Sequence, residues 1–334
     1  MNRFAMGIDI GGTHSTAGIV DLDQQQLISK SIVRTYTDSS GNLSEILKSW
    51  VNLIRQCLSK IESNNLEGIG IAMPGPFDYV NGISEIINVG KYESLFGLNI
   101  RYALAFKLKN LVIPEQIRFM NDAHCFLAGE TWQDETRSQN VIGLTLGTGF
   151  GSAFYRSNKI VDSGGGVPPG GFFFNQSFRN ARAEDYFNTK WFINRYLELS
   201  SNRINDVESL ARLAESNKTA LKVFKEFAVN LAEFLHDYFI DFKGQKLIIG
   251  GSISKSYFLF KDELEKELSK RNIKIEIEIS KFGEQAALIG AARLIDNEFY
   301  SKQPVFKLQN SFSTDNENHE NGKLQSTDWR KTKQ

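Results

Sequence analysis

Residues 4–15 read FAMGIDIGGTHS, a short apolar run that ends in an acid, two glycines and a hydroxyl. Four to eight apolar residues bounded by glycine are typical of a buried strand. Gly11 and Gly12 lack a Cβ, so the backbone can turn tightly there and approach a ligand. We expect their free N–H groups and the Thr13 hydroxyl to bind phosphate oxygens. The Asp9 carboxylate is placed to hold a hydrated Mg²⁺ that those phosphates carry.

A plain β-hairpin turn without a ligand explains the same stretch, because residues 13–20 continue as a second strand. Short glycine motifs also match by chance. The choice between these interpretations depends on whether the chain supplies the other parts of a nucleotide site.

The composition of the 334 residues is ordinary for a globular protein and leaves room for two domains. Lys+Arg and Asp+Glu both number 39, so no basic excess predicts nucleic-acid binding. Cys57 and Cys125 are the only cysteines, which excludes a disulfide framework and fits a reducing compartment. No apolar stretch approaches the ~20 residues of a membrane span, and the N-terminus has no signal segment. We therefore expect a cytoplasmic protein without a membrane partner.

Strand and helix patterns alternate along the first part of the chain. We expect three strands within residues 4–36, a helix over 43–61 with apolar residues at helical spacing, and a strand over 68–73. A helix that returns to a sheet edge indicates an α/β layer architecture.

The second part of the chain repeats the opening pattern. In residues 141–154 an apolar strand runs into Gly-Thr-Gly at 147–149, and a second strand follows. A third strand over 246–250 also ends in glycines. Two strand–turn–strand units predict two similar halves that face a shared phosphate, although two unrelated hairpins would give the same pattern.

Two loops and one acid follow strands of the first half. Pro74-Gly75-Pro76 ends the strand over 68–73 abruptly, where a ligand or only a rigid connector is expected. Asn121-Asp122 closes a strand over 117–120 and opens a helix over 123–132. Asp122 could be only the helix N-cap, since Asp and Asn are favoured there.

Three further expectations concern the remaining segments. The glycine-rich residues 164–171 form either a mobile loop at the cleft or a flexible connector. Residues 183–199 form a helix with Glu184 near its start, and His124 packs inside the protein or lies on its surface. Residues 309–334 are too polar to offset their ordering entropy and are expected to be disordered.

Together these segments resemble the ROK family of sugar kinases, within the actin-like, ribonuclease-H-like ATPase superfamily. The resemblance covers roughly residues 4–298. Five segments in the family's order carry it: residues 9–13 (DIGGT), 74–76 (PGP), 121–123 (NDA), 146–151 (LGTGFG) and 249–254 (IGGSIS).

The resemblance implies an α/β fold of two ribonuclease-H-like domains that flank a nucleotide and sugar cleft. The implied domains are residues 1–121 and 122–285, with a last helix at about 286–298 that returns to the first domain. Residues 301–334 are then a disordered polar tail. The family is compatible with a homodimer.

The resemblance also implies roles for single residues. Asp122 is the general base that takes a proton from the sugar hydroxyl. The residues implied to bind ATP with its Mg²⁺ are Asp9, Gly11, Gly12, Thr13, Thr148, Gly149, Gly250 and Gly251. The residues implied to contact the sugar are Gly75, Asn88, Asn121 and Glu184.

The chain departs from the family where many members carry Glu-x-Gly-His and then a Cys-x-Cys-Gly-x-x-Gly-Cys zinc site. Pro168 stands at the glutamate, Gly171 stands at the histidine, and residues 172–183 hold no cysteine. We therefore expect no bound zinc. The sugar also loses two hydrogen-bond partners near its anomeric end, which makes glucose a doubtful substrate.

The expected function is ATP-dependent phosphorylation of a hydroxyl on a small-molecule sugar or sugar derivative. The alternative is a non-catalytic sugar or nucleotide sensor with the same fold. Repressors of this family carry an N-terminal helix-turn-helix. Since the first strand begins at Phe4, we expect none here and no nucleic-acid partner.

Overall fold

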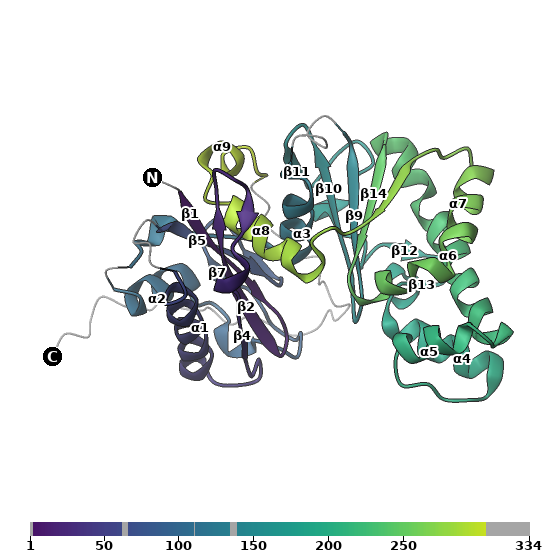
Figure 1. Cartoon of the computed structure of the whole chain (residues 1–334), viewed down its shortest axis with the longest axis horizontal. Helices are drawn as coiled ribbons and strands as arrows, with labels where there is room; N and C mark the ends of the chain where they lie inside the picture. The colour runs from purple at the N-terminus through teal and green to yellow at the C-terminus, as the bar shows by residue number, and fades with distance from the viewer. Residues whose placement is uncertain (1–2, 62–65, 110, 134–138, 305–334) are drawn as a thin grey trace, which may run out of the picture.

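The computed structural model describes residues 3–61, 66–109, 111–133 and 139–304, so the polar tail predicted from residue 309 lies outside the described residues. Two mixed sheets form the framework, and Figure 1 shows them side by side. The first sheet contains β1 (Phe4–Ile10), β2 (His14–Asp21), β3 (Gln26–Leu27), β4 (Val33–Tyr36), β5 (Leu66–Met73) and β8 (Ile117–Asn121). The second contains β9 (Val141–Leu146), β10 (Phe150–Arg156), β11 (Lys159–Val161), β14 (Lys246–Gly250) and β15 (Glu276–Ile279).

The two sheets share one plan. The strand order is β3-β2-β1-β5-β8 in the first sheet and β11-β10-β9-β14-β15 in the second. In each, the central strand pairs antiparallel with the strand that follows it and parallel with a later strand. The predicted α/β fold of two ribonuclease-H-like halves is therefore confirmed. The division into domains at the stated residues stays a prediction. Two small hairpins, β6 (Phe77–Asp78) with β7 (Ile83–Ser84) and β12 (Ser177–Phe178) with β13 (Ala181–Arg182), lie outside these sheets.

Helices cover both sheets (Figure 1). One apolar core packs α1 and α2 against the first sheet, and another packs the helices α4 to α7 against the second. Among the described residues, no helix combines the length and the apolar character that crossing a membrane requires. The α-helices are α1 (Leu43–Leu58), α2 (Ile100–Lys107), α3 (Asp122–Glu130), α4 (Thr189–Ser200), α5 (Val207–Ala214), α6 (Lys218–Phe242), α7 (Lys261–Lys270), α8 (Ala286–Arg293) and α9 (Asn297–Tyr300).

The helix α8 lies between the halves because glycines let backbones touch there. A Cβ added at Gly70 of β5 would lie 1.7 Å from the carbonyl oxygen of Ala291. On the other side of α8, a Cβ at Gly290 would lie 1.8 Å from the carbonyl oxygen of Cys125 in α3. The helix α8 thus packs directly on β5 of the first sheet and on α3.

The helix predicted over residues 183–199 is wrong at its start. Residues Ala183–Asp185 form a separate 3₁₀ turn, and α4 begins only at Thr189. The cause is Asn188, whose extended backbone ends the preceding segment and whose side chain accepts the N–H of Trp191 as an N-cap. Glu184 therefore lies in a turn before the helix and not in its first turn.

Candidate active site

Parallel pairing brings the carboxyl ends of three strands to one edge of the first sheet. Asp9 of β1 lies opposite Ala72 of β5, and Met73 of β5 lies opposite Asn121 of β8. Ligands of open α/β sheets bind at such edges. The first glycine turn, the Pro-Gly-Pro loop and the Asn-Asp pair therefore share one edge.

The first glycine turn is a hairpin turn and is open to a ligand on one side. The Gly11 N–H donates to the His14 carbonyl at 3.0 Å, so the prediction that this N–H is free is wrong. The turn uses it to close itself, as hairpin turns do. At exposed Gly12, nothing lies within 4 Å of where a Cβ would be. A phosphate can thus approach the backbone at Gly12 but not at the Gly11 N–H.

A buried tyrosine that the sequence did not point to holds this turn. The Tyr92 hydroxyl donates to the Gly11 carbonyl at 2.5 Å, and its ring packs against Trp50. Burial raises the pKa of Tyr92 to about 12, so the hydroxyl stays protonated as a donor at neutral pH. Because 81 residues separate Tyr92 from Gly11, no local pattern could reveal the contact.

Two carboxylates of the cleft, those of Asp9 and Asp122, influence each other electrostatically. Burial raises the pKa of Asp9 to about 7, with further contributions from the charges of Asp122 and Glu284, while Arg34 opposes the shift. An ionised Asp9 is therefore unfavourable without a nearby cation. One or two carboxylates together with substrate phosphates form a typical Mg²⁺ site, so this pair fits that ion.

The N-cap of α3 is Asn121 and not Asp122. The Asn121 Oδ1 accepts the N–H groups of Ala123 at 3.0 Å and His124 at 3.3 Å. Asp122 is exposed in the first turn of α3, and its Oδ1 accepts only the N–H of Ala123, at 2.9 Å. The amide oxygen of Asn121 is occupied by the cap, and its N–H₂ group donates to the Tyr79 hydroxyl at 3.5 Å.

A cleft of about 670 Å³ between the halves receives side chains and turns from both sheets. Besides the predicted residues it is lined by Arg34 and by Lys255, which adds a positive charge. The predicted residues that line it are Asp9, Gly11, Gly12, Thr13, Asp122, Gly250 and Gly251. The predicted residues that are not among its lining are Gly75, Asn88, Asn121, Thr148, Gly149 and Glu184.

The second and third glycine turns lie against each other at the edge of the second sheet. Gly251 has a φ of +84°, and a Cβ there would lie 2.3 Å from the carbonyl oxygen of Leu146, so only glycine fits. At the neighbouring turn, the Glu184 Oε1 lies 3.1 Å from where a Cβ of Gly149 would be. A Cβ at Gly151 would lie 3.1 Å from the Ala123 Cβ, so the first turn of α3 also reaches this hairpin.

His124 fills the space beside the position where the family's histidine is absent. It is buried, its ring stacks on Phe172 at 5.2 Å, and its Nε2 lies 3.0 Å from the Gly170 carbonyl oxygen. A Cβ at Gly171 would lie 3.3 Å from that Nε2. Burial lowers the pKa of His124 to about 4, so it is neutral at physiological pH. His124 therefore packs internally, one of the two placements expected for it.

The end of the glycine-rich segment is packed and is not a loose connector. Gly170 and Gly171 are buried, and the Ser152 hydroxyl donates to the Gly171 carbonyl at 2.7 Å.

Two of the predicted sugar contacts lie in irregular backbone of the first half. Gly75 is the second residue after β5, and exposed Asn88 has a φ of +56°. In the part of the chain that the structure describes, no three His, Cys, Asp or Glu side chains are grouped to hold a metal.

Comparison with known proteins then identifies the family. The ROK family model matches residues 5–170 and 184–298. The chain belongs to the ROK family. The gap in the match falls on residues 171–183, the segment where the ROK zinc motif is missing from the sequence.

Curated ROK relatives include N-acetyl-D-glucosamine kinases. The Haemophilus influenzae enzyme is 22% identical over 317 residues, which cover 86% of this chain and 98% of that protein. The enzyme from Pectobacterium carotovorum is 30% identical over 167 residues, which cover 48% of this chain and 49% of that protein.

Solved structures share the fold. A Streptomyces griseus ROK glucokinase in complex with glucose and AMPPNP has a TM-score of 0.68 and 20% identity, covering 87% of this chain and 98% of that chain. A Thermus thermophilus ROK hexokinase has a TM-score of 0.72 and 18% identity, covering 89% and 99%. A ROK transcriptional regulator also reaches 0.72 at 14% identity, covering 90% and 79%. Since kinases and a regulator share the fold, function must be argued from the cleft.

Proposed function

We propose that this ROK protein is a kinase that transfers the γ-phosphoryl group of ATP to a hydroxyl of a sugar or sugar derivative. The observation that carries the proposal is the pair Asp9 and Asp122 in one cleft with glycine turns from both sheets. Curated relatives along nearly their whole length are sugar kinases. A sensor would not need two carboxylates kept so close that the charge of one raises the pKa of the other.

Asp122 is the general base in this proposal. A sugar hydroxyl is a poor nucleophile at neutral pH, and a carboxylate within hydrogen-bond reach can take its proton as the oxygen attacks phosphorus. Asn121 caps α3, which leaves one carboxylate oxygen of exposed Asp122 without a helix contact. No covalent intermediate on the enzyme is required.

The phosphates are held by backbone and by charge. The open turn at Gly12, with Thr13 beside it, and the turns at Thr148, Gly149, Gly250 and Gly251 are the proposed contacts. A Mg²⁺ held by Asp9 would neutralise charge that develops on the phosphoryl oxygens. Lys255 at the rim of the cleft adds to that neutralisation.

The sugar side of the site differs from that of a glucokinase with the Glu-x-Gly-His segment. The proposed contacts are Gly75, Asn88, Asn121 and Glu184. Pro168 supplies no donor or acceptor side chain, and the imidazole beside Gly171 is committed to the Gly170 carbonyl. An N-acetylhexosamine is the first candidate acceptor, because curated relatives phosphorylate N-acetyl-D-glucosamine. The reaction is assigned to the cytoplasm, where ATP is available.

The test is an ATP-consumption screen across hexoses, N-acetylhexosamines and polyols with the purified full chain. The proposal predicts sugar-dependent ADP formation that requires Mg²⁺ for at least one acceptor. Pro168 and Gly171 replace the glutamate and the histidine that many ROK members carry, and this replacement favours the alternative, a sugar or nucleotide sensor. Saturable binding of a sugar without turnover for any acceptor would support the sensor and contradict the kinase.

A further inference from the structure

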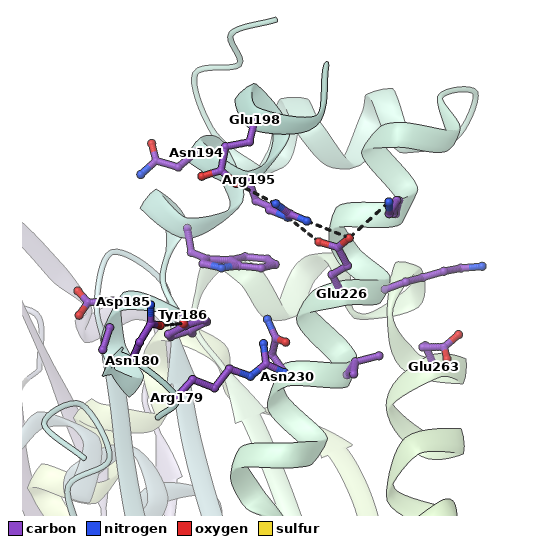
Figure 2. A pocket seen from close by; sticks show the side chains of 15 residues that line it. Arg179, Asn180, Asp185, Tyr186, Asn194, Arg195, Glu198, Glu226, Asn230 and Glu263 are labelled. Atoms are coloured by element: carbon purple, nitrogen blue, oxygen red, sulfur yellow. Dashed lines mark hydrogen bonds and ion pairs between the residues drawn. The ribbon is translucent and has the colours of Figure 1, made fainter. Parts of the chain in front are cut away.

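A second large hollow lies on the outer side of the second half, away from the cleft. Its volume is about 880 Å³, within the range of about 300–1,000 Å³ that small-molecule sites occupy. The β12–β13 hairpin, the turn before α4, and the helices α4, α6 and α7 supply its walls. None of the predicted site residues lines it. We call it the α4–α6 hollow, and Figure 2 shows the side chains around it.

The side chain of Asn230 in α6 lines the hollow without a hydrogen-bond partner among the described residues. The residue is only 7% exposed, and no residue that the structure describes forms a hydrogen bond with its amide. Its amide is not among the fully buried unpaired atoms of the described residues, so it opens into the hollow, where a ligand can reach it. An amide offers two donors and an acceptor, so a ligand with hydroxyl groups would satisfy it.

Two aromatic rings line the same hollow. Trp191 is half-buried, packs its ring on Phe192 and Phe227, and forms no hydrogen bond through its indole N–H within the described chain. Tyr186 lies nearby, with its hydroxyl bonded to Asn180 at 2.5 Å. An aromatic ring with a free polar edge suits a ligand that is apolar on one face and polar at its rim. A sugar ring, with C–H faces and equatorial hydroxyls, has that character.

The charges around the hollow balance, which selects against an ionic ligand. The lining holds four basic side chains, Arg179, Arg195, Lys222 and Lys225, and four acidic ones, Asp185, Glu198, Glu226 and Glu263. Arg195 bonds Glu226 at 2.6 Å and Glu198 at 2.8 Å (Figure 2). Such pairs still present donors and acceptors side by side, which hydroxyl groups can use together.

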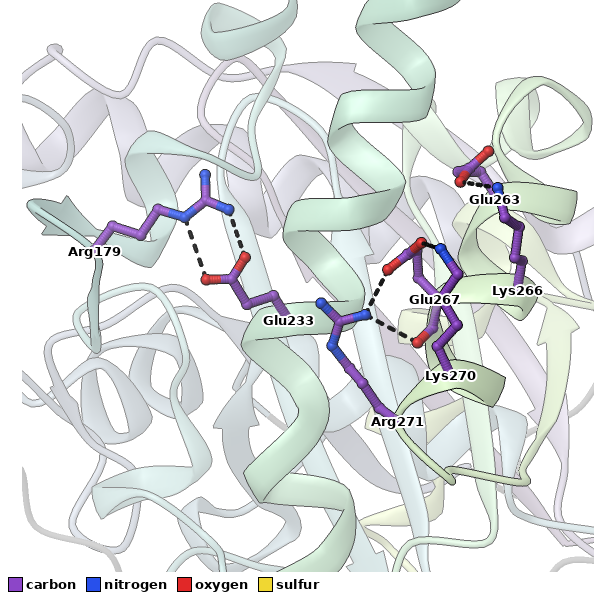
Figure 3. Close-up of polar contacts among 7 residues, drawn as sticks. All are labelled: Arg179, Glu233, Glu263, Lys266, Glu267, Lys270 and Arg271. Carbon is purple, nitrogen blue, oxygen red and sulfur yellow. Dashed lines mark hydrogen bonds and ion pairs between the residues drawn. The ribbon is translucent and has the colours of Figure 1, made fainter.

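A partly exposed ion pair joins the hairpin to α6 at the wall of the hollow. Arg179 of the β12–β13 turn bonds the Glu233 carboxylate on α6 through two hydrogen bonds, of 3.3 and 2.5 Å (Figure 3). The hairpin is thereby held against the helix that carries Asn230. The hollow is thus a built cavity between tied elements.

The hollow is also connected to the second glycine turn through one short segment. Glu184 lies against Gly149 of the second glycine turn, while the next residues, Asp185 and Tyr186, line the hollow. At the start of α4, Thr189 donates to the Gly147 carbonyl through its N–H at 2.8 Å and its hydroxyl at 3.0 Å. A ligand that contacts this segment in the hollow would therefore bias the position of the second glycine turn.

We propose that the α4–α6 hollow is a second site that binds a neutral saccharide, with Asn230 and Trp191 as its main contacts. Binding there changes the affinity of the cleft for its own sugar through residues 184–189. The binding itself is independent of the proposed kinase activity, and only its effect on the cleft rests on that activity.

The test is calorimetric titration of the full chain with glucose, N-acetylglucosamine, maltose and N,N′-diacetylchitobiose. We expect at least one probe to bind with a Kd that rises at least tenfold in Asn230→Leu and in Trp191→Ala. Asn230→Leu should melt close to wild type, because the side chain forms no hydrogen bond with the described residues and leucine is of similar size. Asn52→Leu, the same change at an exposed position of α1, is the matched control and should leave the Kd unchanged.

Three outcomes would overturn the proposal. One is that no probe shows binding sensitive to Asn230→Leu. Another is that inorganic phosphate, and no saccharide, shows such binding. The third is a dimer that Trp191→Ala converts to a monomer in sedimentation, which would mean that a second copy covers the hollow. Saccharide binding in the hollow without phosphorylation of any sugar would contradict the proposed kinase activity and leave the second site standing. Sugar phosphorylation without saccharide binding in the hollow would contradict the second site and leave the kinase activity standing.

Discussion

Replacing Asp9 by asparagine should make the nucleotide-free protein more stable at neutral pH while weakening its binding of Mg²⁺ and ATP. Burial and the Asp122 charge raise the pKa of Asp9 from 3.8 to about 7. The folded protein therefore keeps a proton on Asp9 that the unfolded chain releases near pH 3.8. The contribution of protonated Asp9 to the free energy of unfolding is complete below about pH 3.8. It decreases as the pH rises and is lost as the pH passes through about 7.

The magnitude follows from the shift. The pKa of Asp9 differs by about 3 between the folded and the unfolded protein, which corresponds to about 4 kcal/mol at about 1.4 kcal/mol for each pKa unit. Between about pH 5 and about pH 8, the wild type should lose about 3 kcal/mol of unfolding free energy that Asp9→Asn does not lose. Groups common to both proteins cancel in the difference between their profiles.

The assay is urea unfolding of both proteins across that pH range without nucleotide or Mg²⁺. Asp262→Asn, at an exposed position of α7, is the control and should follow the wild type. Titration with Mg²⁺ and AMPPNP at about pH 8 should show weaker binding by Asp9→Asn. Parallel stability profiles for the wild type and Asp9→Asn would refute the assignment of a destabilised carboxylate behind the first glycine turn.

Three further predictions test the packing, the turn and the absent zinc motif. Gly70→Ala should lower the free energy of unfolding by about 3 kcal/mol in a denaturation experiment, because the new Cβ would meet the Ala291 backbone. Gly12→Ala is the control, because open space surrounds Gly12, and it should change the free energy of unfolding by less than about 0.5 kcal/mol. Tyr92→Phe removes the donor to the Gly11 carbonyl, so the KM for ATP should rise several-fold with a stability loss of about 1 kcal/mol, and an unchanged KM would contradict the role given to Tyr92. Elemental analysis of the purified protein should find no stoichiometric zinc.

The sequence predicted those parts of the cleft that depend on local pattern. Strands that end in glycines, such as those before residues 11–12 and 250–251, predict a turn, and the two turns line the same cleft from different sheets. The contact of Tyr92 with Gly11 could not be predicted, since it depends on the path of a loop 81 residues away. The prediction of a free Gly11 N–H was wrong, because the hairpin turn uses that group to bond the His14 carbonyl.

Capping explains two further differences between prediction and structure. Either member of the Asn121-Asp122 pair could begin α3, and one residue of register decides which side chain is left for chemistry. The helix expected from residue 183 begins at Thr189, because Asn188 supplies a cap in the middle of a helix-compatible pattern. Helix ends are set by such single contacts, which periodicity cannot resolve.

The role of Asp122 as general base is decided by the turnover of Asp122→Asn with the best acceptor from the ATP-consumption screen. Asn121 holds the cap and asparagine is nearly isosteric with aspartate, so the melting temperature and ATP binding should change little. Loss of a general base typically lowers the rate by ~10²–10⁴-fold, so we expect kcat to fall by that factor. Phosphorylation of that acceptor at the wild-type rate would show that Asp122 is not the base. A loss of several kcal/mol of stability with unchanged activity per folded molecule would show that its role is structural.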